Sequence, residues 1–493
     1  MNYLLIIMLN DDLTQQIKRN FSYKPTELQE KAINSFVDFV RSKVENQIFL
    51  LKGFAGTGKT TLVGAFVKAF YDMHWNCVLL APTGRAAKVF SHYAGHSAFT
   101  IHKKIYRQKS FSNDTDNFSL NVNLHKHTLF IVDEASMIAN EGLAGVSFGT
   151  GRLLDDLIQY VYGEEKHCRL MLVGDTAQLP PVGEEESPAL SVPMLEGYGL
   201  EVMACHLTQV VRQMSDSGVL YNATLLRRRL MEEDIFDLPK VKFEGFPDVQ
   251  MVSGSELIDT ITSCYDKAGM DETMIICRSN KRANLYNRGI RNTILYREDE
   301  LNSGDWLMVA KNNYFWGADC KELDFIANGD IAQVRRVRRT HELYGFRFAD
   351  VVLVFPDYQD VELEVKILLD TLHSDAASLT KEESDRLFQA VYDDYEDITV
   401  KRERLKKIKE DEWYNALQVK YAYAVTCHKA QGGQWQHVFL DQGYMTEDML
   451  TPDYFRWLYT AFTRATDTLY LVNWPKEQIE VTESLETKDS FPE

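Results

Sequence analysis

The glycine-rich segment GFAGTGKT is the part of the sequence whose residue types and spacing most clearly predict chemistry. It begins at Gly53 and fits the pattern G-x-x-x-x-G-K-[ST], with an apolar run before it and a helical pattern after it. Glycines at these positions let consecutive backbone N–H groups face phosphate oxygens, and a helix N-terminus adds partial positive charge. The segment therefore predicts a nucleoside triphosphate site, in preference to a glycine turn with a surface lysine.

Two side chains of this segment have predicted roles in phosphoryl transfer. Lys59 is expected to reach the β- and γ-phosphates of ATP, and the Thr60 hydroxyl is expected to ligate Mg²⁺. The other residues expected to contact ATP surround them in the same turn: Gly53, Ala55, Gly56, Thr57, Gly58 and Thr61.

A pair of carboxylates follows another apolar run, in TLFIVDEAS. Asp133 is expected to hold Mg²⁺ through water, and Glu134 is the candidate base for the attacking water. The next apolar run ends in GDTAQLPP, where Gln178 is expected to sense the γ-phosphate, because glutamines orient the attacking water in other P-loop enzymes. The alternative for Gln178 is a solvent-exposed side chain beside a Gly-Asp turn. Together these residues predict hydrolysis of ATP.

Short apolar runs that alternate with helical patterns must position these residues, which predicts parallel sheets covered by helices on both faces. The first set of predicted strands lies at residues 47–53, 77–81, 128–133 and 169–175, and the second at 274–277, 422–427, 437–441 and 468–472. The distance from 277 to 422 is too long for one crossover.

The intervening residues, 293–420, have a different sequence pattern from both sets of predicted strands. They start with β-like segments (WLMVA, IAQVRRV, VVLVF) and continue into a highly charged helical stretch at 381–412. We interpret them as a domain inserted into the second α/β unit. Acids and bases alternate in the charged stretch, which favours a solvated helical arm over a DNA-gripping or partner-binding role.

Seven segments in order carry a family resemblance: GFAGTGKT, APTGRAAK, DEAS, GDTAQLPP, LTQVVRQ, TCHKAQGGQW and YTAFTRA. With them the chain resembles the superfamily 1B DNA helicases, and in particular the RecD-like and Dda-like enzymes, from about residue 26 to 472. The resemblance implies an α/β fold with two RecA-like P-loop domains. It also implies a small hairpin insert in the first domain and an SH3-like β-barrel insertion in the second.

The expected domains follow from this resemblance and from the strand pattern. Domain 1A is expected at 1–205, with its insert 1B at about 103–127. Domain 2A is expected at 206–292 and 421–480, domain 2B at 293–420 as barrel plus charged arm, and a tail at 481–493.

Further ATP-site residues are implied by the resemblance. Gln29 in TELQEKA is similar to the family's adenine-reading glutamine, and Gly432 lies in the motif beside the nucleotide cleft. Arg212 in LTQVVRQ and Arg464 in YTAFTRA resemble its two arginine fingers. Independently of the family, a guanidinium from another domain would neutralise the charge that phosphoryl transfer spreads over three oxygens, although a single arginine is more often a surface ion pair.

The resemblance also implies a groove for single-stranded DNA. The residues expected to line it are Pro82, Thr83, Arg85, Lys88, His102, Thr426, His428 and Lys429. Short polar groups and backbone amides after a strand end can hold phosphates. Two alternatives stay open: Lys88 as a solvated helix residue and His102 as a surface histidine.

The sequence gives only a weak indication of which residue separates the DNA strands. Within the insert, RQKSFSNDTDNF is polar and rich in turn residues, and Phe111 is its one candidate wedge. A loop-tip aromatic that packs locally is the favoured alternative. The aromatics of NNYFWG, at 312–317, are expected mostly in the core of the barrel and partly facing DNA.

Composition limits the remaining classes. The net charge is −18, from 54 basic and 72 acidic residues, which argues against a wholly basic nucleic-acid coat but not against a local basic channel. Seven scattered cysteines without a C-x-x-C pair argue against a disulfide framework and against zinc, so we expect a cytoplasmic protein. No apolar run is long enough to cross a membrane. The segment LLIIML, at 4–9, is expected to form a buried strand or helix edge; Met8 as the true first residue is the alternative.

The predicted function is an ATP-dependent DNA helicase that moves along single-stranded DNA and acts as a monomer. The resemblance implies 5′-to-3′ movement. Two alternatives stay open: an ATPase that remodels nucleoprotein or acts on RNA without unwinding duplex, and a non-enzymatic nucleotide-gated adaptor. A nuclease fusion is disfavoured, because few residues follow Arg464 and residues 293–420 show no compelling carboxylate–lysine site.

Overall fold

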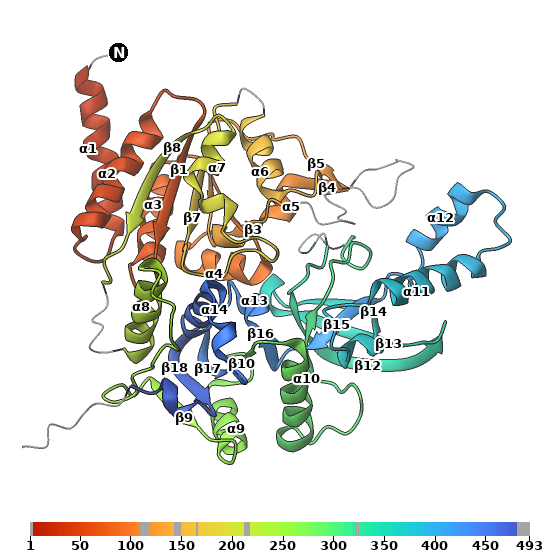
Figure 1. Ribbon diagram of the computed structural model, residues 1–493. Helices are drawn as coiled ribbons and strands as arrows, with labels where there is room; N and C mark the ends of the chain where they lie inside the picture. The colour runs from red at the N-terminus through yellow and green to blue at the C-terminus, as the bar shows by residue number, and fades with distance from the viewer. Residues whose placement is uncertain are drawn as a thin grey trace, which may run out of the picture.

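The computed structural model describes residues 3–108, 118–141, 149–163, 166–211, 217–318, 320, 323 and 325–480. Two α/β lobes lie one above the other, and a small β-barrel with a helical arm lies beside the lower lobe (Figure 1). The first lobe, the second lobe and the barrel are each defined below by one sheet and the helices around it.

The first lobe is built on a parallel sheet of six strands in the order β3-β2-β6-β7-β1-β8. Its strands are β1 (Gln47–Gly53), β2 (Cys77–Ala81), β3 (Ala98–Thr100), β6 (Leu129–Val132), β7 (Arg169–Gly174) and β8 (Glu201–Leu207). Its helices are α1 (Tyr3–Asn20), α2 (Glu27–Arg41), α3 (Lys59–Asp72), α4 (Gly84–Ala94), α5 (Ile101–Ile105), α6 (Leu153–Tyr162) and α7 (Val192–Gly197), with the short 3-10 turns η1 (Ala135–Met137) and η2 (Pro188–Leu190).

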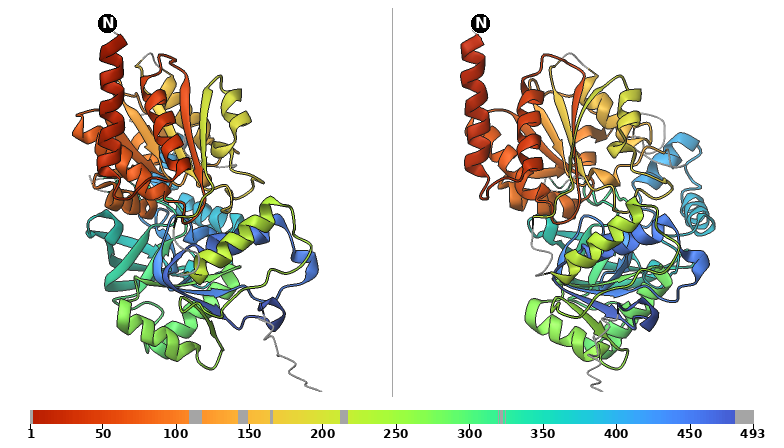
Figure 2. Two further views of the ribbon diagram at one scale, coloured as in Figure 1. Left: turned by 90° about the vertical axis from the view of Figure 1, so that its left-hand side faces the viewer. Right: turned by 60° about the vertical axis from the view of Figure 1, so that its left-hand side comes forward.

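Alternate residues of these strands enter two separate cores, as buried parallel strands require. Phe49 and Leu51 of β1 pack with α1 to α4 on one face, while Ile48 and Leu50 pack with α5 and α6 on the other. Figure 2 shows α1 standing at the outer edge of this lobe. The apolar segment at 4–9 forms part of this helix. The sheet continues to Leu207, just past the expected boundary at 205.

A short antiparallel hairpin leaves the first lobe after α5. It pairs β4 (Tyr106–Gln108) with β5 (Phe118–Leu120), so the expected insert contains a hairpin. The candidate wedge Phe111 lies outside the described residues.

The second lobe has a parallel sheet of five strands in the order β16-β10-β17-β18-β9. Its strands are β9 (Val249–Val252), β10 (Thr273–Cys277), β16 (Ala424–Thr426), β17 (Trp435–Asp441) and β18 (Ala465–Val472). Its helices are α8 (Gly218–Met231), α9 (Leu257–Ala268), α10 (Asn280–Gly289), α13 (Cys427–Ala430) and α14 (Pro452–Phe462), with the short turns η3 (Ile290–Ile294), η6 (Glu447–Met449) and η7 (Lys476–Gln478). Helices α8 and α14 cover one face, while α9 and α10 cover the other.

Between α10 and β16 the chain forms a closed five-stranded barrel, so the expected barrel insertion is confirmed. Its strands are β11 (Trp306–Val309), β12 (Ile331–Leu343), β13 (Phe346–Phe355), β14 (Val361–Leu368) and β15 (Leu417–Tyr421), with the turns η4 (Pro356–Tyr358) and η5 (Leu369–Leu372). The charged stretch forms two helices, α11 (Lys381–Asp394) and α12 (Lys401–Lys409), which pack through Leu387, Val391 and Ile408 on Phe346 and Phe348 of the barrel.

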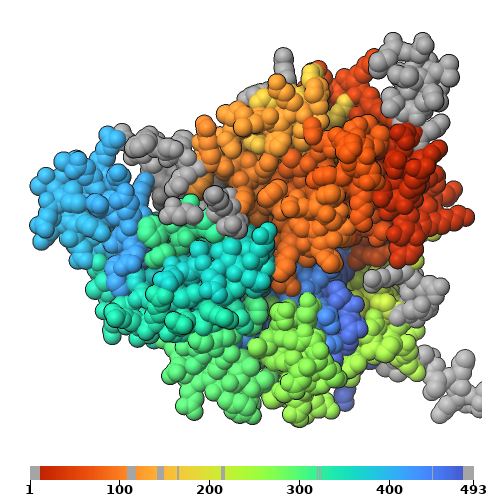
Figure 3. Space-filling view, turned by 180° about the vertical axis from the view of Figure 1, so that it is seen from behind, coloured from red at the N-terminus to blue at the C-terminus, as the bar shows by residue number. Residues whose placement is uncertain are grey.

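The barrel contacts the first lobe as well as the second. Lys88 of α4 pairs with Asp357 of η4 at 3.1 Å, and the ring of Phe118 in β5 lies 4.5 Å from that of Tyr314. In Figure 3 the barrel surface lies directly below the first lobe, and the arm projects from the body. Within the described part of the chain, no helix combines the length and apolar character that crossing a membrane requires.

Candidate nucleotide and nucleic-acid sites

The P-loop lies between the end of β1 and the start of α3. Gly56 and Gly58 have φ angles of 75° and 80°, in the left-handed region that favours glycine. A Cβ on Gly58 would lie 2.6 Å from Nε2 of Gln29, and one on Gly56 would lie 2.6 Å from Cδ1 of Leu220. Both glycines are therefore required by conformation and by space, and the turn presents its N–H groups at the start of α3.

Lys59 is held within this turn. Its Nζ donates to the carbonyl oxygens of Gly53, at 2.5 Å, and Phe54, at 3.2 Å, and lies 3.9 Å from Oδ2 of Asp175. The hydroxyl-bearing residues Thr60 and Thr61 follow it in the first turn of α3 and are exposed. The ammonium group is thus placed at the mouth of the turn, where a phosphate would compete for it.

Asp133 and Glu134 follow β6 directly. Oδ1 of Asp133 accepts the N–H of Glu134 at 2.9 Å, and its Oδ2 accepts the hydroxyl of Tyr93. Glu134 has a φ of 51°, a left-handed conformation that turns its side chain away from the strand direction. Burial raises the pKa of both carboxyls; Lys59 opposes that rise at both, and Arg464 opposes it at Glu134. A carboxylate with a raised pKa beside a phosphate site is suited to accept a proton from water.

Gln178 lies in the loop after β7 and is buried, which excludes the solvent-exposed alternative. Its Oε1 accepts no hydrogen bond from the described residues, and the same is true of the Ser136 hydroxyl. A buried amide without a partner costs free energy, of the order of 1–3 kcal/mol, unless another molecule supplies a donor. A water molecule at this position would supply one.

The residue that sequence reasoning missed is Tyr459, in α14 of the second lobe. Its hydroxyl accepts the P-loop N–H of Ala55 at 2.8 Å and donates to Oδ2 of Asp175 at 2.7 Å. Asp175 is buried and also accepts the N–H of Ala177 at 2.9 Å. One side chain of the second lobe thus joins the P-loop to the loop that carries Gln178.

Two more hydrogen bonds fix that loop to the second lobe. The N–H of Leu179 donates to Oγ1 of Thr460 at 2.8 Å, and its carbonyl accepts from Nε2 of Gln431 at 2.7 Å. Asp175 and Gln431 stand inside GDTAQLPP and HKAQGG, and Tyr459 and Thr460 stand inside YTAFTRA. The motifs therefore marked these segments, but only the fold shows which side chains meet.

Arg464 is buried at the end of α14. It donates to the carbonyl oxygens of Thr460, at 3.0 Å, and Gly433, at 3.1 Å, and to Oγ1 of Thr463 at 3.2 Å. Its positive charge opposes part of the rise that burial causes in the pKa of Glu134, so the two side chains interact electrostatically between the lobes. The other expected finger, Arg212, lies outside the described residues.

Two further residues expected to contact ATP lie on different sides of the site. Gln29 is buried and donates from Nε2 to the P-loop carbonyl of Thr57 at 3.0 Å, so it supports the turn directly. Gly432 lies instead against the start of α4: a Cβ there would be 3.0 Å from Cβ of Ala86 and 3.2 Å from Oγ1 of Thr83. The structure thus brings Gly432 to the residues expected to bind DNA rather than to the P-loop.

Four of the expected DNA-binding residues lie on or beside α4. Pro82 and Thr83 lie between β2 and α4, and Oγ1 of Thr83 accepts the N–H of Ala86 at 3.2 Å as a helix cap. Arg85 donates to the carbonyl of Gln434 at 3.0 Å and stacks 4.5 Å above the ring of Trp435. Arg85 therefore joins the two lobes in this conformation.

Lys88, the fourth of these residues, and His102 lie around the same junction. Lys88 is exposed and pairs with Asp357 of the barrel, and its Nζ donates to Pro356 O at 3.2 Å. His102 lies in α5 with its ring 6.3 Å from Phe325, and burial lowers its pKa to about 4. His102 is thus neutral at pH 7.

Thr426 ends β16 at the carboxyl edge of the second sheet, and His428 and Lys429 follow it in α13. Burial lowers the pKa of Lys429 to about 8. The neighbouring Lys420 has a pKa of about 8, lowered first by burial and then by the charge of Lys429. A phosphate beside Lys429 would stabilise its charged form, which burial disfavours.

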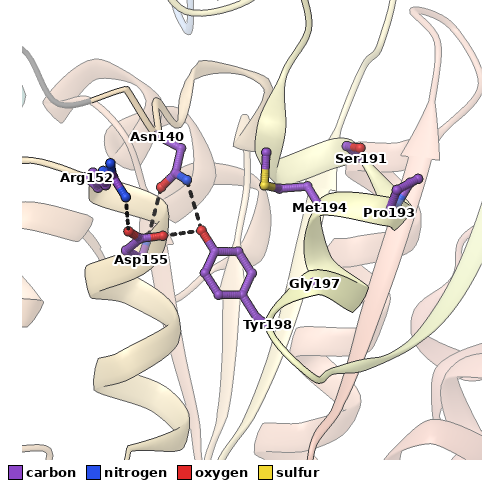
Figure 4. Close-up of a pocket in the computed structure, with 8 residues that line it drawn as sticks. All are labelled: Asn140, Arg152, Asp155, Ser191, Pro193, Met194, Gly197 and Tyr198. Carbon is purple, nitrogen blue, oxygen red and sulfur yellow. Dashed lines mark hydrogen bonds and ion pairs between the residues drawn. The ribbon is translucent and has the colours of Figure 1, made fainter.

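A separate cavity of about 660 Å³ lies on the first lobe between α6 and α7 (Figure 4). Its polar side chains bind one another: Asp155 pairs with Arg152 at 3.5 Å and accepts the hydroxyl of Tyr198, which in turn accepts Nδ2 of Asn140 at 2.9 Å. These contacts fix the loop that follows Glu134 to α6 and α7, which is a structural role.

Two protein-family models match the regions that hold these sites. The model of the AAA domain matches residues 28–233, which contain the P-loop and the following strand ends. The model of the UvrD-like helicase C-terminal domain matches residues 421–472, which contain Thr426 and Arg464. Together with the helicase relatives described next, these matches support a superfamily 1B helicase.

The helicase is similar to several proteins in sequence. It is 29% identical over 179 residues to the ATP-dependent RecD2 DNA helicase of Deinococcus radiodurans, across 36% of this chain and 21% of that protein. It is 24% identical over 291 residues to the ATP-dependent DNA helicase dda of Enterobacteria phage T4, across 58% of this chain and 60% of that one. An uncharacterised protein of Acanthamoeba polyphaga mimivirus is 23% identical over 516 residues, across 90% of the helicase and 98% of its own length.

Among solved structures, the helicase is similar to the Pif1 helicase from Bacteroides in complex with ADP-AlF3 and ssDNA. The two chains are 16% identical, with a TM-score of 0.45, and the likeness covers 94% of this helicase and 95% of that chain.

Proposed function

We propose that this helicase moves along single-stranded DNA and couples ATP hydrolysis between its two lobes to separation of the strands. The observation that carries the proposal is the Tyr459 hydroxyl, which joins Ala55 of the P-loop to Asp175 from the opposite lobe. A change at the phosphates would therefore have a direct route of hydrogen bonds into the second lobe, which holds three of the eight residues expected to line the DNA groove.

ATP would bind where the P-loop N–H groups and Lys59 face the start of α3. Lys59 would exchange its carbonyl partners for the β- and γ-phosphates, because a phosphate offers a full opposite charge at the same position. Bound Mg²⁺, held by Thr60 and through water by Asp133, would neutralise charge on the phosphates. Thr60 and Asp133 offer the oxygen ligands that this metal prefers.

Hydrolysis requires a base and a charge-stabilising group on opposite sides of the γ-phosphate. Glu134 would accept the proton of the attacking water, and Gln178 would orient that water through its unpartnered Oε1. Arg464 would supply the guanidinium from the second lobe, and Arg212 is proposed as a second one. Val211, which precedes Arg212, donates its N–H to the P-loop carbonyl of Gly56 at 2.9 Å, so this segment runs beside the site.

The single strand would cross the junction of the two lobes. Thr83, Arg85 and Lys88 would hold it from the first lobe, and Thr426, His428 and Lys429 from the second. Pro82 and His102 would line the same path. Gly432 contacts Thr83 across this junction, so movement of one lobe against the other changes the spacing of the two grips. Alternating grip would convert each hydrolysis into a step along the strand.

We propose the domain boundaries of the sequence analysis for this mechanism, with β15 extending the barrel to Tyr421. We also propose movement in the 5′-to-3′ direction and action as a monomer. The direction follows from the resemblance to RecD-like and Dda-like helicases.

A strand-displacement assay tests the function. A duplex with a 5′ single-stranded tail should be unwound with ATP, a duplex with a 3′ tail should not, and Lys59→Ala should abolish turnover while leaving some DNA affinity. ATP hydrolysis that DNA stimulates without any displacement would favour a translocase that remodels nucleoprotein, and stimulation by RNA in place of DNA would redirect the substrate. Absence of ATP turnover with and without DNA would favour a nucleotide-gated adaptor.

A further inference from the structure

The outward strand β12 of the barrel carries an unusual concentration of positive charge. The sequence RRVRR spans residues 335–339, and all four of its arginines are exposed. The chain as a whole has a net charge of −18, so a basic strand of this kind is a local exception. Neither the ATP site nor the expected single-strand groove includes these residues.

Two irregularities in the pairing of β12 with β13 place the four arginines on one face. The register shifts between Val334 and Arg336 and again between Val337 and Arg339. Regular alternation would turn every second residue into the barrel, which would bury an arginine. Each bulge adds one residue to β12. Val334 and Val337 therefore still pack on the core, while Arg335 and Arg336 between them and Arg338 and Arg339 after them stay outside.

Two of the four arginines pair with acidic residues of a nearby strand. Arg335 lies 3.8 Å from Glu362, and Arg338 pairs with Glu364, both on β14. Within the described chain, no acidic side chain forms an ion pair with Arg336 or Arg339. The four arginines therefore leave a net positive face even with Glu362 and Glu364 counted, and exposed pairs of this kind exchange partners at little cost.

The arginine face begins near the expected DNA groove and leads away from it. Asp330, directly before β12, lies 2.9 Å from the Cβ position of Gly84 at the start of α4. A strand rises about 3.3 Å per residue and each bulge takes up one residue, so Arg336 and Arg339 lie at most about 17 and 23 Å beyond that point. Figure 1 shows the β12–β13 hairpin extending outward below α11.

We propose that the arginine face of β12, formed by Arg335, Arg336, Arg338 and Arg339, binds the phosphate backbone of duplex DNA next to the single-stranded groove. Sites for single strands combine positive charge with aromatic rings on which bases stack. The run of four arginines contains no aromatic residue, and Val337 between them faces the core, so this face offers charge alone. A duplex, whose bases are stacked inside, presents the matching surface. The inference rests on the proposed function, because it places the duplex part of the tailed substrate.

Equilibrium binding of a 5′-tailed hairpin duplex and of the single-stranded tail alone tests the proposal. In the full chain, Arg336→Gln with Arg339→Gln should weaken binding of the tailed duplex about tenfold at low salt. The slope of log affinity against log salt should become shallower by about 2, since two phosphate contacts are lost. Affinity for the tail alone and its stimulation of ATP hydrolysis should not change.

Two further variants sharpen the result. Lys240→Gln with Lys267→Gln removes the same charge from exposed positions of the second lobe and should leave both affinities unchanged. Glu362→Gln with Glu364→Gln frees Arg335 and Arg338 and should tighten duplex binding.

An unchanged duplex affinity in the arginine variant would overturn the proposal, and so would an equal loss on the tail alone. Failure of the proposed function is a separate result, because it would show as absent DNA-stimulated hydrolysis in the unmodified chain.

Discussion

The hydroxyl of Tyr459 connects the two lobes through two hydrogen bonds. It satisfies the N–H of Ala55 and one oxygen of Asp175 at once, in a buried setting where a lost partner is expensive. Because this hydroxyl lies beside the P-loop rather than among the expected phosphate ligands, we regard it as a positioning group.

Tyr459→Phe should lower kcat for ATP hydrolysis about tenfold, which corresponds to about 1.4 kcal/mol, and should leave KM for ATP nearly unchanged. Steady-state kinetics in the presence of single-stranded DNA measure both. Tyr454→Phe is the matched control, because its hydroxyl lies in the same helix and, among the described residues, bonds to Gln442 and Gln478 alone. A rise in KM with constant kcat would assign Tyr459 to binding instead.

Residue types alone predicted part of this site and could not predict the rest. The spacing of Gly53, Lys59 and Thr60 identifies a P-loop because backbone geometry, not tertiary contact, sets that spacing. The pairing of Tyr459 with Asp175 joins residues 284 positions apart, and no local pattern contains it. Arg85 shows the same limit: its motif predicts a phosphate contact, while its guanidinium lies on Trp435 of the other lobe.

At the scale of elements, the contact between the barrel and α4 contains a buried carboxyl group. Asp330 is buried there, where it accepts the N–H of Ala327 at 2.7 Å and the hydroxyl of Tyr358 at 2.9 Å. Burial raises its pKa from 3.8 to about 7, and the nearby charge of Asp357 adds to the rise. The protonated carboxyl is therefore the form that this junction favours.

A raised carboxyl pKa gives stability that is present at low pH and lost as pH rises through the folded pKa. Relative to Asp330→Asn, the unmodified protein should lose roughly 3 kcal/mol between pH 5 and pH 8. Urea denaturation at both pH values measures the difference. The amide costs one hydrogen bond at every pH, so the slope with pH is the informative quantity. Equal slopes for both proteins would contradict a raised pKa at Asp330.

The elements themselves were predictable to differing degrees. Apolar runs identified four strands in each parallel sheet, since buried parallel strands need continuous apolar character, but strands β3, β8 and β9 were not predicted. The barrel followed from family resemblance rather than from alternation. Strand β12 explains why: its RRVRR run breaks a period of two, and only its register shifts reconcile that run with a packed core.

For the whole molecule, the two lobes should act as one nucleotide-dependent unit. Glu134→Gln removes the proposed base but keeps the shape and the phosphate contacts of the site. We expect hydrolysis to fall about 100-fold or more while ATP binding persists.

ATP at 100 times its Kd should then stabilise this variant by about 2.7 kcal/mol against unfolding, without being consumed. Thermal unfolding with and without ATP, together with phosphate release, measures the two quantities. Lys59→Ala is the comparison, because loss of the ammonium should remove most of the ATP-dependent stabilisation. Hydrolysis by Glu134→Gln at the unmodified rate would require a different base.

The position of Gly84 would allow the contact between the barrel and the first lobe to be disrupted selectively. A methyl group there would lie 2.4 Å from the Tyr358 hydroxyl and 2.9 Å from Oδ1 of Asp330, both on the barrel. Its φ is negative, so alanine is compatible with the backbone and only the neighbouring wall resists it. Gly84→Ala would therefore clash with the barrel and weaken its contact with the first lobe. Because the substitution adds no charge and removes none, its effect on that contact would be steric.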